Sequence, residues 1–156
     1  MTPFRLSGLD PTTFIDLFER DDETLARSNI RRVRATAAFG FPCRISLEDA
    51  AVGEELLLLP FQHLPQASPY QASGPIFVRR GVAQAILAPG EIPPYVARRL
   101  MSLRAYDAEH LMRDADVVDG ASVAHALSAL LARPEIAYVH LHNAKRGCYS
   151  CLAQRA

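Results

Sequence analysis

The sequence has no surplus of charge of either sign, because 17 basic residues balance 17 acidic ones. Proteins that bind nucleic acids usually carry a basic excess, since neutralising phosphates supplies much of their affinity. A polybasic segment, which would attract anionic membrane surfaces, is absent as well. We therefore expect no nucleic-acid partner and no membrane partner.

Long apolar segments and an even set of cysteines are lacking too. The longest apolar runs, such as residues 56–59, are far shorter than the roughly 20 residues that span a bilayer. The N-terminal segment has no basic stretch followed by an apolar one, so it does not resemble a secretory signal. Three cysteines then indicate free thiols in a reducing compartment. These features predict a cytoplasmic protein.

What the sequence does contain is enough apolar material for one core. The chain has 156 residues, of which 49% are hydrophobic and 22% charged, both near the average for globular proteins. A chain of this length buries close to 70% of its unfolded surface. It shows no internal repeat and no linker between composition blocks. We therefore expect a single domain over residues 1–156.

Strand patterns outnumber helix patterns. Residues 31–37 alternate between apolar and polar positions, as a half-buried strand does. We predict further strands at 55–61, 75–79, 101–106, 111–118, 136–142 and 148–154. Helices are predicted at 95–100, at 120–132 and after Asp10, which is expected to be the N-cap. A short helical turn is predicted to open at Ser46. Short connections favour antiparallel pairing. The sequence thus predicts an α+β fold: a mostly antiparallel twisted sheet with two or three helices packed on it.

The predicted hairpin at the end of the chain contains the residues best suited to bind a metal or to react. His140 and His142 are two apart on a predicted strand and so share a face. A five-residue turn would place Cys148 opposite His142, and imidazole with thiolate is a common zinc ligand set. His63 or Cys43 would have to supply a fourth ligand. The alternative is that the histidines form hydrogen bonds at a sheet edge and the cysteines are small core residues.

The same residues could serve a cysteine nucleophile. Cys148, activated by His142 or His140, is the first catalytic candidate. Cys43 is the second, because it lies beside Arg44 and shortly before the predicted Ser46 turn. No protease or oxidoreductase motif surrounds either cysteine, so buried and inert thiols are the alternative.

A third pattern is typical of anion binding. A turn at Ser73 and Gly74 leads into a predicted strand, and backbone N–H groups there, with Arg79, could hold a carboxylate or phosphate. An ordinary turn between strands is the alternative. Arg104 and Tyr106 share a face of their predicted strand and could line a pocket, or simply pack as a cross-strand pair.

Three separated segments together resemble a known family. They are residues 41–50, residues 68–70 with 73–79, and residues 140–144 with 147–148. Jointly they are similar to an uncharacterised bacterial family called domain of unknown function twelve-oh-three. The resemblance spans almost the whole chain and implies a small bacterial protein with no established activity and no assigned catalytic residues.

The three segments also suggest where a site would lie, since a site usually gathers residues from distant parts of a chain. Around one cleft we expect Cys43, Arg44, His63, Ser73, Arg79, His140, His142, Asn143 and Cys148. Three functions remain open. The first is a binding module for a small polar or anionic ligand. The second is an enzyme that is either metal-assisted, with zinc as the expected metal, or cysteine-dependent. The third is a homodimeric interaction protein without chemistry.

Overall fold

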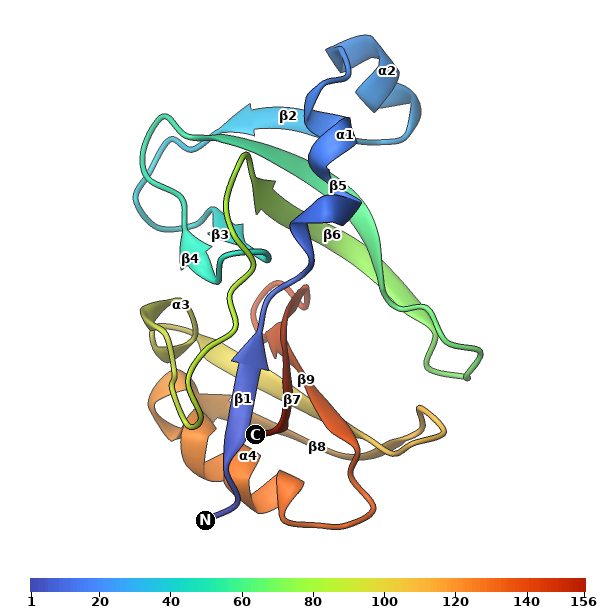
Figure 1. Ribbon diagram of the computed structural model, residues 1–156, viewed down its shortest axis with the longest axis vertical. Coiled ribbons are helices and arrows are strands. Elements are labelled where there is room, and N and C mark those ends of the chain that lie inside the picture. The colour runs from blue at the N-terminus through green and yellow to red at the C-terminus, as the bar shows by residue number, and fades with distance from the viewer.

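The computed structural model describes all 156 residues and contains two five-stranded sheets (Figure 1). The α+β class predicted from the sequence is confirmed, with the strands divided between two sheets instead of forming one. We call them sheet A and sheet B. Both chain termini lie in sheet A, at the bottom of Figure 1, and sheet B lies above it.

Sheet A has the strand order β1-β10-β9-β7-β8, and every neighbouring pair is antiparallel. Its strands are β1 (Phe4–Ser7), β7 (Leu100–Tyr106), β8 (Met112–Asp119), β9 (Tyr138–Asn143) and β10 (Tyr149–Arg155). Because β1 pairs with β10, the first strand of the chain is held beside the last. This pairing fixes both ends of the chain in one sheet.

Sheet B has the order β2-β5-β6-β3-β4. Its strands are β2 (Arg31–Arg34), β3 (Pro42–Cys43), β4 (Glu48–Asp49), β5 (Glu55–Leu64) and β6 (Ala72–Arg79). All pairs are antiparallel except β3 with β6. The β5–β6 hairpin is the longest feature of the sheet, and it extends beyond the other strands (Figure 1).

The helices are short. They are the 3-10 helix η1 (Pro11–Thr13), α1 (Ile15–Phe18), α2 (Asp22–Arg27), α3 (Pro94–Ala97), the 3-10 helix η2 (Gly120–Ser122) and α4 (Val123–Leu131). The predicted cap is present, since the Asp10 carboxylate accepts a hydrogen bond from the backbone of Thr12. None of these helices is long and apolar enough to cross a membrane.

Each sheet has its own core. In sheet A, 16 buried residues form one cluster, in which Val123, Leu127 and Leu131 of α4 cover one face of the sheet. In sheet B, a second cluster of 10 buried residues joins Phe14 and Phe18 to the β5–β6 hairpin. The other face of sheet A is therefore not covered by α4, and it is this face that carries the polar residues described below.

Gly8 marks the point where the chain passes from sheet A to sheet B. Its backbone N–H donates to Ala85 O, and the next N–H, of Leu9, donates to Arg44 O. A Cβ at Gly8 would lie 2.0 Å from the carbonyl oxygen of Ile45. Only glycine permits this approach, so the two sheets are joined by close backbone contact.

Two local predictions are wrong. No helical turn opens at Ser46: residues 44–47 form a tight turn in which Leu47 has a φ of 52°, and the chain continues into β4. The side chain of Leu47 is buried in this turn. Ser73 and Gly74 do not form a loop, because β6 already begins at Ala72 and pairs there with Leu64.

Candidate functional site

The face of sheet A away from α4 is polar and aromatic. Leu103 and Ala105 of β7 lie in the core, so strand alternation directs Arg104 and Tyr106 to the opposite face. The register places Arg104 beside His140 on the adjacent strand β9. We call the group on this face the histidine cluster; it comprises His63, Arg104, Tyr106, Tyr138, His140, His142 and Tyr149.

Three imidazoles from both sheets form the centre of the cluster. His63, from β5, has its ring centroid 4.9 Å from that of His142 and 6.0 Å from that of His140. The predicted shared face of His140 and His142 is observed, with ring centroids 6.4 Å apart. Tyr149 of β10 stacks on His63 at 5.4 Å with an interplanar angle of 11°. The cluster thus lies where the β5–β6 hairpin of sheet B meets sheet A.

Tyrosines close one side of the cluster. Tyr106 and Tyr138 are stacked with centroids 5.3 Å apart, and both rings lie close to His140. The Nδ1 atom of His110, in the β7–β8 turn, is 2.9 Å from the Tyr138 hydroxyl. Burial raises the pKa of Tyr138 to about 12, so its hydroxyl stays protonated near neutral pH. Ser68, at the tip of the β5–β6 hairpin, donates a hydrogen bond of 2.8 Å to His110 O.

Polar atoms in the centre of the cluster have no protein partner. They are His63 Nδ1, His140 Nδ1 and His142 Nε2. In His142 the other ring nitrogen, Nδ1, lies 2.9 Å from Gly147 O, which can only accept a hydrogen bond. Neutral His142 therefore carries its proton on Nδ1 and presents a bare acceptor at Nε2. Buried polar atoms normally have a hydrogen-bond partner. Three neighbouring nitrogen atoms without one therefore indicate a place where a ligand or water can bind.

Burial keeps these imidazoles neutral. It lowers the pKa of His140 to about 3 and that of His142 to about 4, and it lowers the pKa of His63 as well. Positive charge on Arg104 acts in the same direction on all three rings. The hydrogen bond to Gly147 opposes part of the shift at His142. The cluster is thus a neutral polar surface next to a permanent cation.

That cation, Arg104, has no partner of its own. Six arginines are at least partly buried. Five of them donate hydrogen bonds to protein oxygens: Arg32, Arg44, Arg79, Arg99 and Arg133. Arg104 makes neither a hydrogen bond nor an ion pair within the chain. A half-buried guanidinium normally has such a partner, so Arg104 is free to pair with an anion from outside the chain.

Next to the cluster, Arg44 connects the two sheets. Its Nε donates to Tyr149 O at 2.7 Å, and its Nη2 lies 3.0 Å from Cys148 Sγ. The amide nitrogen of Asn143 approaches the same sulfur at 3.6 Å. Arg44, Cys148 and Asn143, all predicted as site residues, therefore form a second group beside the histidines.

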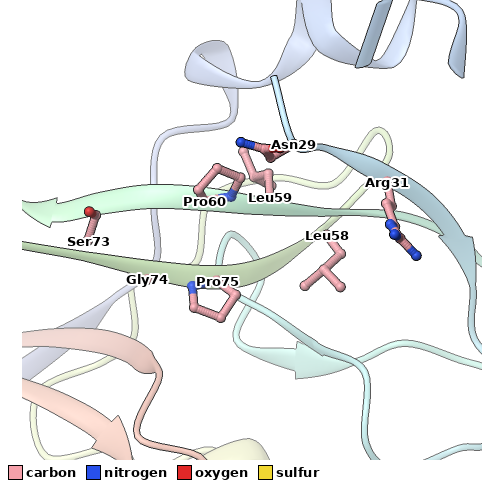
Figure 2. A pocket seen from close by; sticks show the side chains of 8 residues that line it. All are labelled: Asn29, Arg31, Leu58, Leu59, Pro60, Ser73, Gly74 and Pro75. Atoms are coloured by element: carbon pink, nitrogen blue, oxygen red, sulfur yellow. The ribbon is translucent and has the colours of Figure 1, made fainter. Parts of the chain in front are cut away.

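The remaining predicted residues lie elsewhere. The guanidinium of Arg79 donates hydrogen bonds to Glu54 and Ser46, and the Arg79 backbone nitrogen lies 3.2 Å from the buried sulfur of Cys43. Ser73 lines a shallow hollow of about 470 Å³ on sheet B, together with Asn29, Arg31, Leu58, Leu59, Pro60, Gly74 and Pro75 (Figure 2). None of the histidines lines that hollow. The nine residues expected around one cleft are thus divided among four places: the histidine cluster, the group around Arg44, the contact between Arg79 and Cys43, and the hollow at Ser73.

The predicted register of the terminal hairpin is wrong. Tyr149, and not Cys148, lies opposite His142, because the turn comprises residues 144–147 only and the N–H of Asn143 donates to Cys148 O. The sulfur of Cys148 faces Arg44 as a result. No group of three or more histidine, cysteine, aspartate or glutamate side chains is placed to hold a metal ion. The ligand set predicted from His140, His142 and Cys148 is therefore not assembled.

Sequence reasoning missed the part of the cluster that the tyrosines supply. Tyr149 and Tyr138 carry no motif, and only the fold brings them to the histidines. Alternation along β7 did indicate that Arg104 and Tyr106 share a face. The feature that indicates a site is that no acidic side chain pairs with Arg104 in the structure. The sequence does not reveal this, because it does not show which side chains are neighbours.

Comparison with known proteins gives a family and no activity. Residues 40–155 match the model of the family described as Protein of unknown function (DUF1203). No curated protein and no solved structure matches the chain. The matched range contains every residue of the histidine cluster and the neighbouring Arg44, Cys148 and Asn143. The match confirms the resemblance noted in the sequence, and the chain belongs to the DUF1203 family.

Proposed function

We propose that the chain binds a small oxyanion at the histidine cluster, with Arg104 as its charge partner. The observation that carries the proposal is the unpaired guanidinium of Arg104 beside the buried imidazoles of His140 and His142 and the half-buried imidazole of His63. The charged groups that lower the pKa values of these imidazoles are all basic: Arg104, Arg44 and neighbouring histidines. A carboxylate or phosphate would neutralise this positive region and form charge-assisted hydrogen bonds with the arginine.

The acceptor nitrogen of His142 narrows the chemistry of the ligand. Its Nε2 has no partner and carries a lone pair when Nδ1 is bonded to Gly147 O. The preferred ligand therefore offers an O–H or N–H donor besides its negative oxygens. Monohydrogen phosphate and 2-hydroxycarboxylates have both an O–H donor and negative oxygens, whereas a simple carboxylate has only the negative oxygens.

Thermal denaturation with matched small anions tests this function. At constant ionic strength the protein is heated with inorganic phosphate, lactate or propionate, the last two differing by one hydroxyl. A ligand at ten times its Kd stabilises the folded state by about 1.4 kcal/mol, which corresponds to roughly 3–6 °C for a chain of this size. We expect phosphate or lactate to exceed propionate.

Two variants separate the site from general salt effects. Arg104→Gln removes the unpaired charge and is expected to abolish the stabilisation. Arg98→Gln removes an exposed arginine that likewise lacks an ion pair, and it should keep the full effect. An equal shift in the parent and in Arg104→Gln would show that the anion binds elsewhere and would refute the proposal.

A further inference from the structure

Arg44 is a buried cation without a carboxylate. It is only 1% exposed. Its guanidinium donates to Tyr149 O at 2.7 Å, to Pro42 O at 2.6 Å and to Cys148 Sγ at 3.0 Å. Two of these acceptors are backbone carbonyl oxygens, which carry no formal charge. Cys148 is the one contact that can become an anion.

A charge this deep in a protein needs a counter-charge. Removing an ion from water is expensive, and buried ions are accordingly found paired. If Cys148 were a neutral thiol, Arg44 would be a buried cation stabilised only by dipoles. A thiolate at Sγ removes that imbalance, because it accepts the Nη2–H bond and neutralises the guanidinium.

Asn143 provides a second and independent indication. It is 9% exposed, its amide nitrogen lies 3.6 Å from Cys148 Sγ, and its Oδ1 is buried without any partner. Two N–H donors therefore converge on the sulfur, from Arg44 and from Asn143. Beside them stands an unused acceptor that could receive a hydrogen bond from a group attached to that sulfur.

We infer that Cys148 is a nucleophilic thiolate paired with Arg44, and that it is oxidised by hydroperoxides to a sulfenic acid. The sulfur attacks one peroxide oxygen, an S–O bond forms and the O–O bond breaks. Hydroxide leaves from hydrogen peroxide, or alkoxide from an organic hydroperoxide, and takes up a proton. Sulfur thus loses two electrons, and the peroxide is reduced to water or to an alcohol while its other oxygen stays on sulfur as S–OH. The new S–O–H group can donate to Oδ1 of Asn143.

The other two cysteines serve as internal controls. Cys43 and Cys151 are fully buried, whereas Cys148 is partly exposed. Burial raises the pKa of Cys151 to about 12, which keeps that thiol protonated. Only Cys148 combines access to solvent with a cationic donor on its sulfur.

Peptide-resolved alkylation of the folded protein by iodoacetamide tests the thiolate. An ordinary thiol with a pKa of about 8.5 loses about 75-fold in rate between pH 8 and pH 6. Cys148 is expected to lose less than about fivefold, because Arg44 keeps it ionised. If the alkylation rate of Cys148 fell about 75-fold between pH 8 and pH 6, as for an ordinary thiol, the inference would be overturned.

Two variants and a trapping reaction complete the test. Arg44→Met removes the counter-charge but also two bonds to the backbone, so it is informative only if it folds. Asn143→Asp keeps Arg44 and places a competing carboxylate beside the sulfur; it should lower the alkylation rate at pH 6 at least about tenfold. With hydrogen peroxide and dimedone, the adduct should form on Cys148 of the parent and of Arg104→Gln. An unchanged rate in Asn143→Asp, or no adduct in the parent, contradicts the inference while leaving anion binding untouched.

Discussion

The buried histidines of β9 should make stability depend steeply on pH. A histidine in an unfolded chain has a pKa near 6.5, whereas burial lowers the pKa of His140 to about 3 and that of His142 to about 4. Below pH 6.5 the unfolded chain therefore binds protons that the folded protein does not. The free energy of unfolding must fall as the pH falls through this range.

The magnitude follows from the two shifts. Each group changes the free energy of unfolding by 1.36 kcal/mol per pH unit where only the unfolded chain is protonated. Between pH 7 and pH 5 this amounts to about 2 kcal/mol for each histidine, or about 4 kcal/mol together. Small domains are stable by about 5–15 kcal/mol. Acidification to pH 5 should thus remove a large part of the stability.

Urea unfolding at pH 7, 6 and 5 measures this effect. Carboxylates contribute little in that window, because their pKa values near 4 keep them ionised in both states. His140→Gln and His142→Gln should each remove about 2 kcal/mol of the change between pH 7 and pH 5, and the lowered pKa of His63 contributes to the change that remains. His125→Gln, on the exposed side of α4, is the matched control and should behave as the parent does.

The opposite result would be informative. If the parent lost less than about 1 kcal/mol between pH 7 and pH 5, the imidazoles could not be buried in the neutral form. The same conclusion would follow if each glutamine variant showed the full pH dependence of the parent. Either outcome would remove the electrostatic argument for the histidine cluster.

Two further changes test how the cluster is held together. Ser68→Ala removes the hydrogen bond from the β5–β6 hairpin to His110 O; it should cost about 1 kcal/mol and speed amide exchange at the hairpin tip. Protection equal to that of the parent would show that the contact does not hold the hairpin. Gly8→Ala brings a Cβ within 2.0 Å of Ile45 O, so the junction of the sheets must shift. The denaturation midpoint should reveal a loss of about 3 kcal/mol or more, and a midpoint close to that of the parent would refute this packing.

Much of the secondary structure is predictable from the alternation of apolar and polar residues and from residues that cap helices. The pattern of residues 101–106 predicted a half-buried strand, and β7 occupies Leu100–Tyr106. The cap at Asp10 was also predicted correctly. The division into two sheets was not predicted, because alternation shows which face of a strand is buried and not which strands are neighbours. That choice depends on contacts such as the one between Gly8 and Ile45.

The site was predictable only in part, for the same reason. His140 and His142 share a face because they lie two residues apart on one strand, and sequence alone suffices for that. The position of Cys148 depends on the hairpin register: the turn at residues 144–147 pairs it with Asn143 instead of His142, and its sulfur contacts Arg44. His63 joins the cluster through a hairpin from the other sheet. No local pattern encodes such a meeting.

The claim that the histidine cluster binds an oxyanion is tested most directly by imidazole nitrogen resonances. Phosphate is titrated into nitrogen-labelled protein at pH 7 and constant ionic strength. We expect saturable shifts for His63, His140 and His142, none for the exposed His125, and none for any histidine in Arg104→Gln. Shifts that are absent, that spread equally to His125, or that persist without the Arg104 guanidinium would contradict it.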